Sequence, residues 1–180
     1  LGAGDPIVLA AIDWCEIRKQ SHERWCAVLA RAAGTVPQRV ILCSVHQHDA
    51  PVSDLGAEAI LDIAGLGGAT LDAAFQESAI QAVALALQAG LQDARTVTHV
   101  GLGRAKVAEV ASNRRVVMPD GQVSFLRTSH SAGDPVFRDA PEGTIDPWLQ
   151  LISFWEGSEP VLALHAYSTH PMSHYGQGAV

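Results

Sequence analysis

The chain has few of the residues that would mark a disulfide-stapled, nucleic-acid-binding or membrane-spanning protein. Its three cysteines are widely spaced and form no Cys-x-x-Cys pair, which indicates buried free thiols rather than a disulfide framework. Only 12 basic residues stand against 19 acidic ones, so no nucleic-acid surface is expected. No apolar run approaches the ~20 residues of a transmembrane helix. The composition, 48% hydrophobic and 17% charged, predicts one globular domain over residues 1–180.

The first half of the sequence predicts a βαβ unit. Residues 6–13 and 38–46 are apolar runs of strand length, and residues 16–33 between them predict a helix that ends at Gly34. Because the connections are short, the two strands should be parallel neighbours. Residues 50–69 are rich in Gly, Ala and Asp and predict a loop with one helical turn.

The second half predicts one more long helix and then antiparallel strands. Residues 70–93 have helical apolar spacing, with Phe75 on the expected buried face. A strand is predicted over residues 96–107, and hairpins over 110–127 and 148–168. The sequence therefore favours an α/β fold: a mixed β-sheet with two main helices and C-terminal hairpins, with an α+β tendency in the second half. We expect it to be the N-terminal part of a longer catalytic domain.

The second predicted strand ends in a His-x-His pair. In an extended chain His46 and His48 would point to one face, where two imidazoles can bind one divalent cation. Alternatively, one imidazole binds the cation while the other handles a proton on its water, or both are simply polar residues at a strand–loop junction. The last predicted strand also ends in a histidine, His170, and a proline follows both strand ends. The two ends resemble two halves of one site.

Four segments resemble the neutral/alkaline (non-lysosomal) ceramidase family. The segment His46-Gln47-His48-Asp49-Ala50-Pro51 is similar to that family's Thr-His-Thr-His-Ser-Gly-Pro signature. Residues 111–114 resemble its Asn-Arg segment, Asp146 with the strand after it resembles its Val-Asp before a Leu-rich strand, and residues 161–170 resemble the strand before its second zinc histidine. The order and separations agree over residues 7–173.

The resemblance implies an α/β zinc-hydrolase domain that cleaves an amide bond in a small-molecule or lipid-like substrate. By it, His46 and His170 are zinc ligands, whereas His48 and Arg114 contact the zinc-bound water or the substrate oxyanion. Zinc chemistry agrees with these roles, because a catalytic zinc leaves one position to a water whose pKa falls toward ~7. Neighbouring His or Arg side chains can then stabilise the developing oxyanion.

Several positions depart from the family pattern. The pair after the His-x-His is Asp-Ala instead of Ser-Gly, and Arg-Val replaces Ser-Pro after the Asn-Arg. Asp49, Asn113 and His174 are candidate substrate-binding residues, and the charges of Asp49, Arg115 and His174 indicate a smaller, more polar substrate. The family's remaining ligands, a Glu and a Tyr, would follow Val180. The sequence thus favours a ceramidase-like hydrolase over a true ceramidase.

Two other interpretations also fit the sequence. The first is a metal-binding or interaction module that keeps the histidines without turnover. The second is an unrelated metallohydrolase such as the amidohydrolase barrel, whose first strand also ends in His-x-His but which requires alternating strands and helices throughout.

Overall fold

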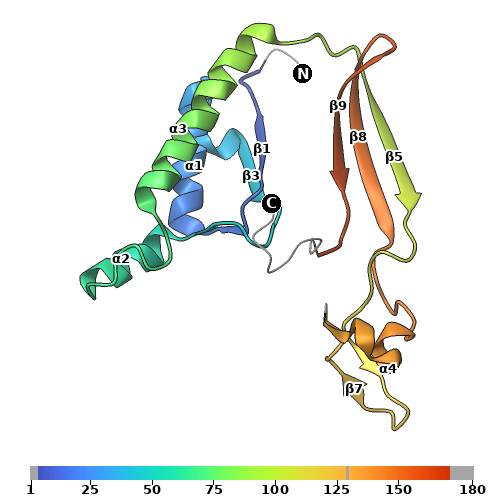
Figure 1. Ribbon diagram of the computed structural model, residues 1–180. Helices are drawn as coiled ribbons and strands as arrows, with labels where there is room; N and C mark the ends of the chain where they lie inside the picture. The colour runs from blue at the N-terminus through green and yellow to red at the C-terminus, as the bar shows by residue number, and fades with distance from the viewer. Residues whose placement is uncertain (1–3, 129, 171–180) are drawn as a thin grey trace. The chain divides into compact units, whose positions relative to one another are not determined.

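The computed structural model describes residues 4–128 and 130–170, and its mixture of helices and strands confirms the α/β class (Figure 1). Where one domain was expected, the described residues form two compact units, 4–94 and 95–170. Among the described residues, no helix has both the length and the apolar character needed to cross a bilayer.

The first unit contains the predicted βαβ arrangement and two further helices. Its elements are β1 (Val8–Ile12), β2 (Glu16–Ile17), α1 (Lys19–Ala33), η1 (Pro37–Arg39), β3 (Val40–Ser44), β4 (Val52–Ser53), α2 (Leu55–Ile63), α3 (Ala73–Gly90) and η2 (Leu91–Asp93).

Strands β1 and β3 confirm the predicted parallel pair, with Val8 opposite Val40 and Ile12 opposite Ser44. Helix α1 joins them and ends at Gly34, whose φ of 67° is the left-handed conformation that glycine adopts most easily. The helix begins three residues later than predicted, because residues 16–17 form β2 and pair in parallel with β4. The loop predicted after β3 holds nine-residue α2 rather than a single helical turn.

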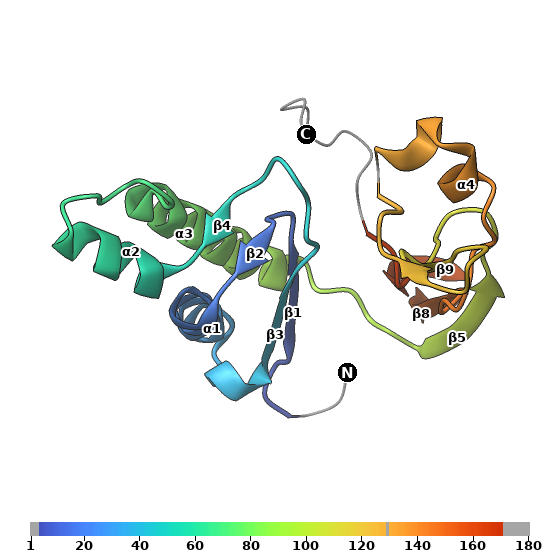
Figure 2. The ribbon, with the colours of Figure 1, turned by 90° about the horizontal axis from the view of Figure 1, so that it is seen from below.

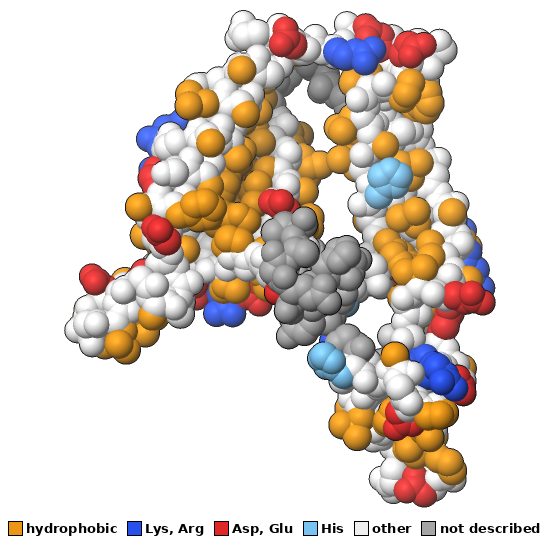
Figure 3. Space-filling view, viewed as in Figure 1, with side chains coloured by type: hydrophobic (Ala, Val, Ile, Leu, Met, Phe, Trp, Pro, Cys, Tyr) orange, Lys and Arg blue, Asp and Glu red, His pale blue; other side chains and the backbone are white. Residues whose placement is uncertain are grey.

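Helices α1 and α3 lie on the same side of the β1–β3 pair (Figures 1 and 2). Trp25, Leu29 and Ile80 are at most 1% exposed at the centre of this core. Apolar side chains gather along the side of α3 that faces the strands (Figure 3). Phe75 was expected on this buried face but is 52% exposed, because α3 instead buries Gln76, Ile80 and Ala84.

The face of the β1–β3 pair opposite α1 carries exposed apolar side chains. Leu9 and Ile41 are about half exposed there, although strands of a parallel sheet usually have both faces covered. Cys43, on the same face of β3, is exposed, so the prediction of a buried thiol is wrong for this residue. Cys26 is buried and Cys15 half-buried, and all three thiols are free, as predicted.

Three buried polar side chains connect β4 and α2 to the helices of the core. The Ser53 hydroxyl donates to Gln76 Oε1, and both residues are at most 1% exposed. The Leu55 backbone N–H donates to the buried Ser21 Oγ at 3.0 Å. These bonds hold β4 and the chain that leaves it against the core helices.

Ser53→Ala should therefore destabilise the protein. The substitution leaves the Gln76 carbonyl oxygen buried without its donor, a change that typically costs about 1–3 kcal/mol. Urea unfolding followed by circular dichroism measures the loss. Ser158→Ala, at an exposed turn position, is the matched control and should stay within about 0.5 kcal/mol of the wild type. Equal stability of the two variants would contradict the structural role of Ser53.

The second unit is mostly antiparallel. Its elements are β5 (His99–Lys106), β6 (Val116–Val117), β7 (Val123–Ser124), η3 (Ser131–Gly133), α4 (Pro135–Arg138), β8 (Trp148–Glu156) and β9 (Glu159–Ala166).

Strand β8 is the central strand of a three-stranded sheet, as the sequence predicted, with β5 and β9 on either side (Figure 1). The two predicted hairpins are also present, as β6–β7 and β8–β9. In the first of them Met118 N–H donates to the Gln122 carbonyl across the turn. The parallel and antiparallel pairs belong to separate sheets.

Candidate metal centre

The segments that follow β1 and β3 run side by side in the first unit. The Val45 N–H extends the ladder by donating to the Ile12 carbonyl at 2.9 Å. Farther along, the N–H groups of Cys15 and Glu16 both point to the Pro51 carbonyl, at 3.0 and 3.4 Å. Both segments leave the carboxyl ends of parallel strands, which is where open α/β sheets bind ligands.

Trp14 anchors the segment after β1 to the core. Its ring is 6% exposed and packs edge-on against Trp25, with ring centroids 5.5 Å apart. A second aromatic ring, that of Phe75, is stacked against Trp14 at a centroid distance of 6.1 Å. The backbone of the following residue, Cys15, is therefore held from both sides, by the buried indole and by the Pro51 carbonyl.

His46 lies at the junction of β3 and the next loop in an unusual backbone conformation. Its φ of 58° is left-handed, which non-glycine residues adopt uncommonly, and residues in such strained conformations cluster at active sites and ligand-binding segments. The ring Nδ1 lies 2.9 Å from the Cys15 carbonyl oxygen. An imidazole that donates its Nδ1–H to a carbonyl presents the Nε2 lone pair to a cation, as metal-bound histidines commonly do.

His48 lies next to His46, as the sequence predicted. The two ring centroids are 5.1 Å apart and the rings are nearly perpendicular. Strand alternation is not the reason, because β3 ends at Ser44 rather than extending to residue 46. The backbone here departs from strand geometry, with left-handed φ values of 58° at His46 and 58° at Asp49. Asp49 itself is exposed on the loop.

Two potential ligands near His46 were missed by the sequence reasoning. A thiol sulfur of Cys15, a carboxylate oxygen of Glu16 and a ring nitrogen of His46 all lie within 4.8 Å of one another, and the three residues are half-buried. Burial, and then the Glu16 charge, raise the pKa of the Cys15 thiol, while Arg18 lowers it. The three side chains form a possible metal site. Their positions after adjacent parallel strands were the signal that could have located them.

Of the other predicted site residues, Asn113, Arg114 and His170 belong to the second unit. Arg114 is exposed, and His170 is an exposed residue four positions beyond β9. The Asn113 amide donates to the Thr144 carbonyl at 2.9 Å and accepts from the Arg115 N–H at 2.9 Å, so this side chain fixes its own loop. His174 lies outside the described residues.

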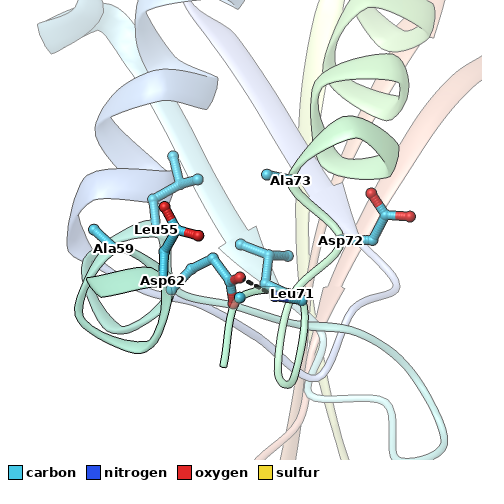
Figure 4. A pocket seen from close by; sticks show the side chains of 9 residues that line it. Leu55, Ala59, Asp62, Leu71, Asp72 and Ala73 are labelled. Atoms are coloured by element: carbon cyan, nitrogen blue, oxygen red, sulfur yellow. Dashed lines mark hydrogen bonds between the residues drawn. The ribbon is translucent and has the colours of Figure 1, made fainter. Parts of the chain in front are cut away.

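A separate pocket of about 550 Å³ lies between α2 and α3 (Figure 4). Two of its carboxylates hold the surrounding backbone: Glu58 accepts from the Gly68 N–H, and Asp72 caps α3 by accepting from the Phe75 N–H at 2.9 Å. Its lining includes no histidine or cysteine. The pocket is therefore distinct from the group around His46.

No family model, curated protein or solved structure matches the chain in the three comparisons.

Proposed function

We propose that the chain is a zinc-dependent hydrolase domain of the neutral/alkaline ceramidase type, which acts on an amide bond. The observation that carries the proposal is the contact between the His46 and His48 rings at the carboxyl end of β3. The left-handed backbone at His46 and the hydrogen bond from its Nδ1 to Cys15 support a ring oriented for ligation through Nε2.

In this proposal His46 and His170 hold the zinc. The assignment of His170 rests on the resemblance to the family. When bound, zinc polarises the substrate carbonyl and lowers the pKa of a water molecule. The His48 imidazole, beside His46, accepts the proton of the attacking water, as a general base.

Arg114 is proposed to stabilise the negative charge that develops on the carbonyl oxygen, since a guanidinium is always charged and offers several donors. Asp49 and His174 are proposed substrate contacts. Asn113 has the weaker case among these, because its amide already makes two hydrogen bonds within its loop. The substrate proposed is a small-molecule or lipid-like amide.

The antiparallel sheet β5–β8–β9 weighs against the amidohydrolase barrel, which requires alternating strands and helices. The remaining alternative is a metal-binding module without turnover, and the experiment below separates it from the hydrolase.

His170→Ala in the full-length protein should abolish amide hydrolysis and weaken zinc binding at the proposed hydrolytic site. Losing one of few ligands should weaken zinc binding by at least on the order of 100-fold, since even indirect partners of a metal site typically contribute 10–100-fold. Zinc content after dialysis and turnover of chromogenic N-acyl anilides measure the two losses. His165→Ala, an exposed histidine in β9, is the matched control and should retain both.

A His170→Ala protein that kept zinc and turnover would contradict the proposed ligand. Wild-type protein that binds zinc at both histidines but hydrolyses neither amides nor esters would identify the non-catalytic module instead.

A further inference from the structure

We infer that Cys15, Glu16 and His46 form a cation site of their own, which takes a borderline-soft divalent ion such as zinc or cadmium. The site lies within the first unit and requires no residue from 95–170. It shares His46 with the proposed hydrolase site, but its two other ligands are different residues.

The separation of the ligand atoms fits a tetrahedral ion. Bonds of about 2.3 Å to sulfur and about 2.05 Å to nitrogen, at a tetrahedral angle, place the two ligand atoms about 3.6 Å apart. The Cys15 Sγ and His46 Nδ1 lie 3.8 Å apart. The Glu16 carboxylate is within 4.8 Å of both partners' ligand atoms, so a small side-chain rotation brings its oxygen into range.

Contacts within the protein already hold Cys15 and Glu16 in place without the ion. The Cys15 N–H is bonded to the Pro51 carbonyl, and the preceding Trp14 is buried in the core. Glu16 Oε2 accepts from Arg18 Nε at 2.6 Å, which orients the carboxylate and leaves it a second oxygen for the cation. A site with positioned ligands loses little conformational entropy when it binds.

The donor set selects the class of ion. A thiolate and an imidazole favour zinc and softer ions, whereas magnesium and calcium prefer oxygen ligands throughout. A thiol binds a metal as its thiolate, so cation binding displaces the Cys15 thiol proton and releases it to solvent.

A consequence for catalysis follows, and it rests on the proposed function. A neutral imidazole has a single lone pair. His46 can therefore bind a cation beside Cys15 through Nδ1, or keep Nδ1–H on the Cys15 carbonyl and bind the hydrolytic zinc through Nε2, but it cannot do both. Occupation of the Cys15 site excludes the hydrolytic arrangement, so excess zinc or cadmium should inhibit turnover.

Cobalt(II) titration of the reduced full-length protein tests the site directly. A cobalt–thiolate bond produces a sulfur-to-metal charge-transfer band in the near ultraviolet, which imidazole and carboxylate ligands do not produce. The wild type should develop this band, and Cys15→Ser should lose it. Cys43→Ser is the matched control, since this thiol is exposed on the neighbouring strand, and it should retain the band.

Glu16→Gln provides a second variant that keeps the thiol. It should retain the band while binding cobalt roughly 10-fold or more weakly. Absence of the band in the wild type, or its persistence in Cys15→Ser, would overturn the site. A wild type that shows the band but hydrolyses no amide would contradict the proposed function alone, whereas a hydrolase without the band would contradict this site alone.

Discussion

His48→Ala should lose roughly 10²–10⁴-fold in kcat, the usual contribution of a positioned general acid or base, while the protein keeps its zinc. The expectation follows from the different roles proposed for the two histidines that follow β3. His46 holds the ion, and the neighbouring ring, 5.1 Å away between centroids, handles the proton. Steady-state hydrolysis of a chromogenic amide and zinc content of the same preparation are the two measurements.

Gln47→Ala is the matched control, because Gln47 lies between the two histidines and is also half-buried. It should retain most of the wild-type kcat. If His48→Ala lost zinc as readily as His170→Ala, His48 would be a ligand rather than a proton carrier. Unchanged kcat in zinc-loaded His48→Ala would remove it from the mechanism.

Trp25→Ala should destabilise the first unit by about 3–5 kcal/mol, the range for truncating a large buried aromatic side chain. Trp25 is 1% exposed in α1, and its ring supports Trp14 at a centroid distance of 5.5 Å. The cavity would therefore open beneath the segment that carries Cys15. Because the whole stability of a domain is about 5–15 kcal/mol, this loss is large enough to measure by denaturant unfolding.

Trp148→Ala is the control for Trp25→Ala. Trp148 begins β8, is 37% exposed, and has Arg104 over its ring at 4.6 Å, so its truncation should cost about 1 kcal/mol or less. Equal losses for the two tryptophans would mean that Trp25 is not the centre of the core.

Much of the fold could be predicted from local patterns. The two apolar runs around α1 required parallel neighbours, and Gly34 supplied the left-handed residue that ends the helix. The residue pattern of β8 predicted a central strand, and β8 does lie between β5 and β9. These features depend on residues close together in the sequence, or on general rules of chain connection.

The candidate site depended on contacts between distant segments, which local patterns do not contain. Residues 16–17 fit a helical start, but pairing with β4 made them a strand. Phe75 fitted the apolar stripe of α3. In the structure Gln76 is buried instead, where its side chain accepts a hydrogen bond from the buried Ser53 hydroxyl. Cys15 looked like an ordinary buried thiol because its neighbour His46 is 31 positions away.

The left-handed backbone at His46 has a consequence for how this loop tolerates change. A side chain with a Cβ in that conformation costs about 1–2 kcal/mol, whereas glycine adopts it freely. His46→Gly would thus relax the turn while deleting the imidazole, so that folding and ligation make opposite demands on one position. Directed evolution that selects only for thermal stability should therefore favour His46→Gly, and the more stable variants would bind metal more weakly.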